Sequence, residues 1–506
     1  MAAAARPDLS MDPPFDLPAG ARVTWDAEEA EKRLVRGRME AIGPVSSATL
    51  AASLGLTSNQ IRRALEALEG DGSILRGRFT PEGVAASDPD ETVSASAGNH
   101  SLEVKEWVSR RLLARIHRLT LDRLRRGMAP VAPEALIRFL LDWSHLTPEN
   151  RLQGKEGVLK VIEQLQGFEI PASAWERDIL PNRVANYDPK WLDALCLWGE
   201  VAWGRTRLGA VRGASRILPI SLMLREDIEW LRLLNGASTE TLGGDARRVL
   251  SLLSQRGALF FNEIVSRTGL LPAQADAALW ELAASGWASG DGFGAIRSLT
   301  SPVRREADRL LRRLKRRGGK VGAARRENGR WWAIDAAGED RAEGDARSEE
   351  KNEFWARQLL ERYGVFFRDL LTREGSAPPW KELLPIFRRL ESRGEIRGGR
   401  FITGVGGEQF ALPETVDLLR RARGETPPEA LILLSAADPM NLAGVLTPGP
   451  KVKGAASNAV VYRGGKPVGN RQANKVWTDP TLPPETARMV ERALKSGKIP
   501  QGTDHD

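Results

Sequence analysis

Runs of arginine and lysine are the residues with the plainest chemistry in this sequence. Residues 304–326 contain eleven Arg and Lys side chains against two acids, and residues 110–126 contain seven arginines against Asp122. Guanidinium and ammonium groups bind phosphates, and each such contact releases counterions that are condensed on a nucleic acid. A single run is equally consistent with a solvated helix face. Two dense runs in a chain with a net charge of +8 favour a polyanionic partner.

Sulfur and imidazole ligands are too scarce for a metal site. Cys196 is the one cysteine among 506 residues, so the sequence excludes an internal disulfide framework and a cysteine-based zinc module. The four histidines, His100, His117, His145 and His505, follow no metal-ligand spacing. We therefore expect no metal and no cofactor.

A repeated segment determines where the arginines lie. Each copy joins an amphipathic helix, with Leu at positions i and i+3, to a glycine and a short alternating stretch with a second glycine. The glycine suits the left-handed position that ends a helix. The copies span Ala64–Phe79, Trp191–Arg205, Ala278–Phe293 and Ile386–Phe401, with the helix-ending glycines at Gly72, Gly199, Gly286 and Gly394.

Helix, glycine and ribbon together predict the recognition helix and wing of a winged-helix domain. The alternating stretches indicate two strands joined by a tight turn. Upstream of the first copy, Thr57 or Ser58 is a plausible N-cap, and Pro272 falls in the first helical turn of the third copy. The second copy is the least regular. We predict four units, give or take one.

The wings and recognition helices supply the candidate DNA contacts. Arg62 and Arg63 accompany Asn59 and Gln60 in the first recognition helix, which would enter a major groove. Wing arginines would reach phosphates, and Trp203 and Trp287, in or next to wings, could stack on a base. The full set of candidate nucleic-acid-binding residues is Arg62, Arg63, Arg76, Arg78, Arg312, Arg313, Arg316, Arg317, Arg397 and Arg400.

These elements predict an α+β fold, mainly α, of tandem winged helices followed by a small C-terminal antiparallel β-barrel. No stretch reaches the roughly 20 apolar residues of a membrane-spanning helix, so we expect no membrane partner. The expected domains are a flexible leader (1–20), winged helix 1 (21–83), a helical segment with winged helix 2 (101–235), winged helix 3 with a basic helix (245–333), a linker (334–352), winged helix 4 (353–425), the β-barrel (428–470) and a C-terminal tail helix (471–506).

The chain resembles the C-terminal region of the bacterial large helicase-related (Lhr) proteins from about residue 20 to 470. The segments that carry the resemblance are Gln255–Ile264, Gly286–Leu299, Leu360–Glu374, Arg388–Phe401, Gly407–Glu414 and Ala437–Gly449. The resemblance implies a tandem array of winged helices closed by a β-barrel, in agreement with the pattern above.

The helicase motifs of that family are missing from this sequence. There is no glycine-rich phosphate loop ending in Lys and Ser or Thr, and no acidic Walker-type box. We therefore expect a C-terminal module that does not hydrolyse ATP by itself and that acts beside a separate helicase subunit.

Residues 158–205 also resemble, more weakly, the AlkZ-type winged-helix DNA glycosylases. On that resemblance Gln164 and Gln166 match a Gln-x-Gln motif that would orient water against the sugar of a flipped nucleotide. A carboxylate would serve better as general base, and Asp178, Asp188 or, separately, Asp438 could supply it. The more ordinary reading of each of these residues is structural: the glutamines cap a helix or face solvent, and the aspartates cap helices or form turns.

The sequence leaves three functions open. The first is a cytoplasmic, nucleoid-associated module that binds single-stranded or damaged DNA in support of repair. The second is a monofunctional DNA glycosylase acting on uracil or another lesion. The third is a scaffold that forms a homo-oligomer or docks a helicase subunit.

Overall fold

The computed structural model describes residues 2–6, 24–80, 105–126, 129–207, 218–232, 239–300, 329–334, 345–424 and 429–499. The chain divides into two compact units, Met1–Arg123 and Leu124–Asp506. Most of the expected leader, and the basic run at 304–326, lie outside the described residues. None of the described helices is both long and apolar enough to cross a membrane.

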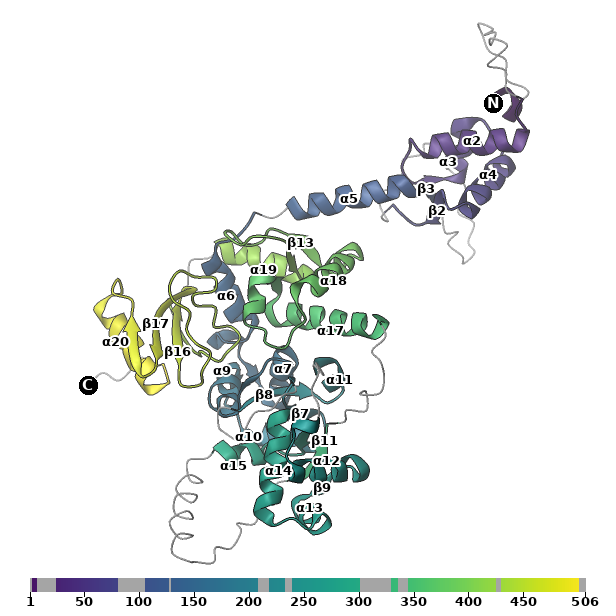
Figure 1. Ribbon diagram of the computed structural model, residues 1–506. Coiled ribbons are helices and arrows are strands. Elements are labelled where there is room, and N and C mark those ends of the chain that lie inside the picture. Colours follow the sequence, from purple (N-terminus) through teal and green to yellow (C-terminus); the bar gives the residue numbers. More distant parts are fainter. Residues whose placement is uncertain are drawn as a thin grey trace, which may run out of the picture. The chain divides into compact units, whose positions relative to one another are not determined.

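The first unit is a helical domain with one small sheet (Figure 1). Its helices are α1 (Ala2–Ala5), α2 (Ala27–Met39), α3 (Ser47–Leu54), α4 (Ser58–Gly70) and the start of α5 (Arg110–Arg126), and its strands are β1 (Val45–Ser46), β2 (Ile74–Gly77) and β3 (Glu106–Ser109). Leu50, Ile61 and Leu65 are fully buried with Val35 and Ile74. The apolar stripe of α4 therefore faces the core, as its Leu spacing predicted.

Four three-stranded sheets in the described part of the chain share one strand order, in which the third strand pairs with both the first and the second. This is the sheet of a winged helix, and the winged-helix prediction is confirmed. The sheets are β1-β3-β2; β5 (Ile170–Pro171), β8 (Pro219–Leu224) and β7 (Val201–Gly204); β9 (Leu259–Phe260), β11 (Arg330–Ala333) and β10 (Ala288–Gly290); and β12 (Val365–Phe367), β14 (Gln409–Ala411) and β13 (Arg397–Gly399).

Helix ends follow the local rules that the sequence suggested. Gly72, Gly199, Gly286 and Gly394 all have φ between 73° and 84°, the left-handed region that glycine enters without steric cost. At the start of α4, the Thr57 hydroxyl and the Gln60 side chain form a reciprocal capping box. Proline at the N-terminus of α14 (Pro272–Ser285) starts that helix.

The wings differ from the tight hairpins that we predicted. Strand β2 pairs with β3, so 28 residues (78–105) connect the two wing strands. Likewise β13 pairs with β14 across residues 400–408, and β10 pairs with β11 across residues 291–329. The tight-turn prediction was wrong because the second glycine of each motif lies within or beside the first wing strand, not at a reversal of the chain.

The second unit contains three winged helices, with the second between the fourth and the third (Figure 1). The second comprises α6 (Pro133–Trp143), α7 (Gly154–Leu165), α8 (Ala172–Ala174), α9 (Leu180–Arg183), α10 (Pro189–Leu197), α11 (Ile228–Leu231) and a parallel pair, β4 (Leu152–Gln153) with β6 (Val184–Ala185). The third comprises α12 (Gly244–Arg256), α13 (Phe261–Thr268), α14 and α15 (Gly294–Thr300); the fourth, α17 (Asp345–Tyr363), α18 (Trp380–Ser392) and α19 (Pro413–Gly424).

Three tryptophans join the second winged helix to the third. Trp203 on β7 lies 5.8 Å from Trp331 and 6.4 Å from Trp280 between ring centroids, and Trp280 and Trp331 meet edge to face. The Ser289 hydroxyl donates to the Trp203 carbonyl, which holds β10 beside β7. Two wings are thus packed into one core.

Strands β15 (Leu431–Ser435), β16 (Ala459–Arg463), β17 (Lys466–Gln472) and β18 (Lys475–Thr478) form an antiparallel sheet in sequence order. Helix α20 (Pro484–Ser496) packs on it through Val490 and Leu494. The described residues show this sheet open, without pairing between β15 and β18, so the closed barrel remains a prediction. Helix α17 begins at Asp345, inside the range predicted as a linker.

Candidate nucleic-acid interface

The first recognition helix presents two exposed arginines that differ in their partners. Arg62 on α4 is exposed and donates from Nη2 to Oδ1 of Asn59, 3.0 Å away. Arg63 is also exposed, but its guanidinium contacts Glu28 at 3.0 Å and Glu31 at 3.2 Å on α2. Arg62 and Asn59 are therefore placed to meet a ligand, whereas Arg63 ties α4 to α2.

The wing of the first unit carries Arg76 and Arg78 on its exposed edge. The Arg76 guanidinium lies over the Trp107 ring at 5.4 Å and 3.5 Å from Glu69. Beyond β2, the Glu106 carboxylate accepts hydrogen bonds from the backbone N–H groups of Phe79 and Thr80. Burial opposes the ionisation of Glu106, but these bonds and the Thr80 hydroxyl lower its pKa. The charged carboxylate on β3 therefore binds the residues that follow β2.

Helix α5 continues directly from the last wing strand and extends the basic surface. Arginines 110, 111, 115, 118 and 123 are all exposed on it. Arg110 and Arg111, with Arg36, line a hollow of about 110 Å³ next to the helix-ending Gly72. Recognition helix, wing and α5 thus give the first unit three groups of solvent-facing guanidinium ions.

The basic run 304–326 belongs to the connection between β10 and β11, the wing strands of the third winged helix. Its candidate contacts, Arg312, Arg313, Arg316 and Arg317, lie outside the described residues. Just before the run, Arg297 on α15 binds Glu176 at 2.7 Å and Asp193 at 2.8 Å in the second winged helix. These ion pairs fix the start of the connection beside α10.

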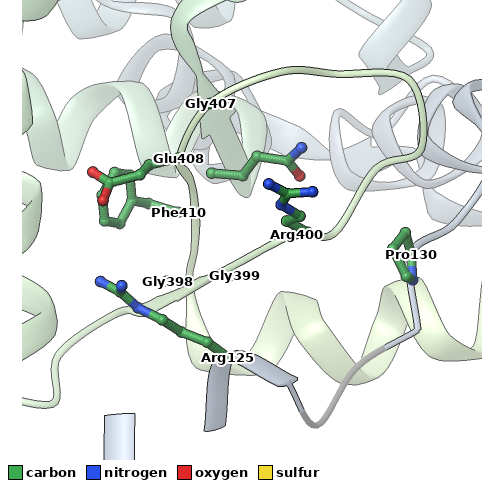
Figure 2. A pocket seen from close by; sticks show the side chains of 9 residues that line it. Arg125, Pro130, Gly398, Gly399, Arg400, Gly407, Glu408 and Phe410 are labelled. Carbon is green, nitrogen blue, oxygen red and sulfur yellow. The ribbon is translucent and has the colours of Figure 1, made fainter. Parts of the chain in front are cut away.

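The fourth wing forms one side of a groove of about 610 Å³ (Figure 2). Gly398, Gly399 and Arg400 follow one edge, Phe410 lies on the neighbouring strand β14 with Glu408 just before it, and Arg125 and Pro130 close the groove. Arg400 is exposed and lies between the wing and Pro130, while Arg397 is half-buried. The groove offers backbone and guanidinium groups, but little open aromatic surface, since Phe410 is fully buried.

The loop of this wing is built around Gln409. Its Oε1 accepts from the backbone N–H groups of Phe401 at 2.7 Å and Ile402 at 2.9 Å, and its Nε2 donates to the carbonyls of Ile402 and Val405. Because one buried side chain satisfies four backbone groups, the loop that carries Arg400 is held in a defined shape.

In contrast, the arginines in and next to the fourth recognition helix are neutralised. Arg388 pairs with Glu408 at 3.0 Å, Arg389 pairs with Glu349 and Glu353, and Arg393 with Glu353 at 3.3 Å. The positive charges around Glu353, with the Arg357 hydrogen bond foremost, lower its pKa, so it remains an anion in this network. Helix α18 therefore offers little net positive charge to a polyanion.

Gln164 and Gln166 lie at the junction of the second and fourth winged helices. Both are buried, at 6% and 4% exposure. The Gln166 amide donates to Asp227 at 2.8 Å and to Gln358 on α17 at 3.1 Å, and accepts from the Leu224 N–H. Gln164 donates to the Trp143 carbonyl at 3.1 Å. These contacts give both side chains a structural role, and their catalytic role stays a prediction.

A buried arginine completes that junction. Arg362 on α17 donates to the carbonyls of Gln164 and Gln166 and pairs with Glu374, with both partners of the ion pair almost fully buried. The Tyr363 hydroxyl donates to the other Glu374 oxygen at 2.7 Å. Burial raises the pKa of Tyr363, so it stays a neutral donor.

Asp438 joins the C-terminal sheet to the second winged helix. Its carboxylate makes a two-pronged ion pair with Arg183, at 2.7 and 2.9 Å, and the two side chains are 1% and 0% exposed. Asp178 pairs with Arg177, and Asp188 caps α10 by accepting from Lys190 N. A general base needs a carboxylate that can reach solvent or substrate. Asp438 does not offer one in this arrangement, because it is buried and paired with Arg183.

Trp203 and Trp287 are not available for stacking on a base, because both are buried, at 0% and 2% exposure. That prediction was wrong: the wing strand carrying Trp203 is covered by the third winged helix. Among the described tryptophans, Trp198 is the most exposed, at 65%. Trp198 lies off the buried Leu192–Leu195–Cys196 stripe of α10, and this offset is visible in the sequence.

Sulfur and metal chemistry have no visible site among the described residues, where no cluster of three or more His, Cys, Asp or Glu side chains could hold a metal ion. Cys196 is buried, and burial raises the pKa of its thiol to about 12. A thiol held so far from ionisation is a poor nucleophile.

Comparison with known proteins identifies two of the winged helices. The model of the family's fourth winged-helix domain matches residues 345–431, the fourth winged helix of this chain. The model of the family's third winged-helix domain matches residues 131–223, which belong to the second winged helix of this chain. The chain is 30% identical over 453 residues to a Mycolicibacterium smegmatis protein named Lhr helicase and probable uracil glycosylase, covering 86% of this chain and 28% of the relative. It is 28% identical over 388 residues to the Escherichia coli Lhr helicase/uracil glycosylase, covering 69% of this chain and 24% of that relative.

The chain thus spans about a quarter of the length of these curated relatives. Among solved structures, the DNA glycosylase AlkZ of Streptomyces sahachiroi aligns with a TM-score of 0.42 and 14% identity, over 73% of this chain and 98% of that one. Two segments of the chain therefore match winged-helix domains of the large helicase-related protein, as its sequence motifs indicated.

Proposed function

We propose that this chain is a DNA-binding module that supports DNA repair, and that its wings and first recognition helix contact the DNA. One observation carries the proposal. Exposed arginines occupy the helix, wing and trailing helix of the first unit, a winged helix by its sheet order. Guanidinium groups in such positions bind phosphates, and a recognition helix reads base edges.

In this proposal the contacts divide by element. Arg76, Arg78 and the arginines of α5 bind backbone phosphates and set the position of the protein. Arg62 and Asn59 on α4 are the residues that reach base edges, where a guanidinium favours guanine and an amide favours adenine. Arg400 and Arg397 add a second contact at the fourth wing, and Arg312, Arg313, Arg316 and Arg317 a third.

The preferred DNA in the proposal is single-stranded or damaged, and a separate helicase subunit is a proposed partner. Both follow from the names of the relatives, which couple a helicase to a uracil glycosylase. A homo-oligomer is a further proposal, which a light-scattering mass above that of a 55.6 kDa monomer would support.

The test is the salt dependence of DNA binding by the full chain. If about six phosphates are neutralised, the log–log slope of affinity against salt is near −5 for duplex. The measurement is fluorescence anisotropy of a labelled duplex over a range of sodium chloride concentrations. Binding that does not change with salt, or no binding at all, would contradict the proposal.

Uracil excision is the second candidate function, favoured by the names of relatives that align with 86% and 69% of this chain. In this version Gln164 and Gln166 orient water and Asp438 supplies the carboxylate. All three are buried, and Gln166 and Asp438 are bonded to neighbouring domains, so catalysis by these two requires those domains to separate.

Abasic-site formation on a uracil-containing oligonucleotide tests the second function. Gln164→Ala with Gln166→Ala, or Asp438→Asn, should abolish it while leaving DNA affinity intact. Thermal unfolding of the same variants is the control, because loss of activity that accompanies unfolding reports a structural role. Full activity in a folded variant would exclude its residues from the chemistry.

A further inference from the structure

Two large apolar side chains face solvent at the end of α10 in the second winged helix. Leu197, the last residue of the helix, is 64% exposed, and Trp198, which caps it, is 65% exposed. In contrast, Leu192, Leu195 and Cys196 of α10 are buried. An exposed indole next to an exposed Leu forms an apolar patch, and apolar patches bordered by polar residues are candidate contact surfaces.

Two cations lie against tryptophans on this surface. The Lys155 ammonium lies 3.9 Å from the Trp198 ring centroid, and the Arg225 guanidinium lies 4.4 Å from that of Trp332. The two pairs adjoin, because an Arg225 nitrogen is 3.7 Å from where a Cβ on Gly199 would lie. Lys155, Leu197, Trp198, Arg225 and Trp332 define what we call the Trp198 platform.

The Trp198 ring retains an open face. Lys155 covers one side, and a side chain that is 65% exposed cannot be covered on both. Arg225 is exposed, and Lys155 has Glu200 at 3.8 Å, a separation that gives a weak pair. A flat apolar surface with a positive charge on either side matches a nucleobase joined to its phosphates.

We propose that the Trp198 platform stacks against an unpaired base of single-stranded DNA, while Lys155 and Arg225 contact the adjoining phosphates. The inference rests on the proposed DNA-binding function and names the form of DNA that this surface takes. Duplex does not fit, because paired bases hide their faces in the stack. A protein partner is less favoured, since both ends of the apolar surface carry cations.

The experiment compares labelled oligothymidine with a duplex of equal length, using the full chain. Trp198→Ala should weaken oligothymidine binding about tenfold, and duplex binding by less than about twofold. Trp198→Phe, which keeps an aromatic face, should retain most of the affinity. Trp477→Ala is the matched control, because Trp477 is 49% exposed on β18 of the C-terminal sheet, and it should leave both affinities unchanged.

The cations have their own readout. Lys155→Ala and Arg225→Ala should each reduce the salt slope for oligothymidine by about 0.7. Lys495→Ala, which removes a surface ammonium paired with Glu491 on α20, should not. Unchanged slopes in both platform variants would overturn the phosphate contacts.

The outcomes separate the inference from the function on which it rests. Salt-dependent binding that Trp198→Ala leaves unchanged overturns the platform and leaves DNA binding standing. Equal losses on duplex and single strand overturn base stacking. If Trp198→Ala changes the mass measured by light scattering relative to the unsubstituted protein and leaves DNA affinity unchanged, the platform is a protein-docking surface instead. No binding to either oligonucleotide overturns both the proposed function and the inference.

Discussion

In the first winged helix, the recognition-helix residue Arg62 donates to the amide of Asn59, whereas in the fourth, Arg388 pairs with a carboxylate of its own domain. Arg389 and Arg393 of the fourth are paired in the same way. The sheets of the two domains have the same strand order. Their backbones are alike, but their electrostatic surfaces are not.

The difference teaches that the winged-helix fold alone does not identify the DNA-contacting surface. In the fourth domain, Glu349, Glu353 and Glu408 pair with the arginines of the helix, which leaves the wing with the exposed arginine Arg400. In the first domain, helix and wing both present guanidinium groups. We infer that the first domain binds by helix and wing, and the fourth by its wing alone.

The largest expected effect is a loss of stability at the buried Arg362–Glu374 ion pair of the fourth domain. Glu374→Ala leaves the Arg362 guanidinium buried without its carboxylate, and should lower the free energy of unfolding by about 3–5 kcal/mol. Urea unfolding followed by circular dichroism measures this. Glu382→Ala, at an exposed position of α18, is the control. A loss below about 1 kcal/mol would show that the ion pair is dispensable.

The exposed arginines of the first domain should affect binding and not stability. Arg62→Ala combined with Arg78→Ala should weaken duplex affinity at least about tenfold, because a base contact and a phosphate contact are lost together. Anisotropy titration at fixed salt measures it. Arg388→Ala with Arg393→Ala in the fourth domain is the matched control and should stay within about threefold. If the control variant loses as much duplex affinity as the test variant, the proposed difference between the two domains is wrong.

A smaller effect is expected at the fourth wing. Arg400→Ala should reduce the magnitude of the duplex salt slope by about 1, since one phosphate contact is removed. The loop built around Gln409 should persist, because Arg400 contributes no side-chain bond to it. If the slope is unchanged, the groove in Figure 2 does not contact DNA.

The smallest effect concerns pH. Burial lowers the pKa of His145 below its usual 6.5, and the charges of Arg183 and Lys160 act in the same direction. The unfolded chain therefore takes up the proton first, and stability should decline as pH falls below about 6.5. His145→Asn, which tolerates the positive φ of this position, should flatten that part of the profile. Thermal midpoints between neutral and mildly acidic pH measure both proteins.

Local rules gave much of the fold from the sequence. The helix-ending glycines, the Thr57 cap and the start of α14 at Pro272 each depend on residues within one or two helical turns. The wing pairing was missed because β2 bonds to β3, whose residues follow a long connection. No local pattern marks a strand whose partner lies that far along the chain.

The candidate site was harder to predict, because burial there depends on contacts between domains. Gln166 binds Gln358, 192 residues away, and Asp438 binds Arg183, 255 residues away. Trp203 lies on a wing strand, but the sequence does not show that the third domain buries it. The exposed Trp198 could have been found from its place off the apolar stripe of α10.

Amide hydrogen exchange with and without DNA tests the central claim most directly. Duplex should protect α4 (Ser58–Gly70) and β2 (Ile74–Gly77), while α18 (Trp380–Ser392) should exchange at the same rate in both states. Protection of α18 without any change in α4 and β2 would contradict the account.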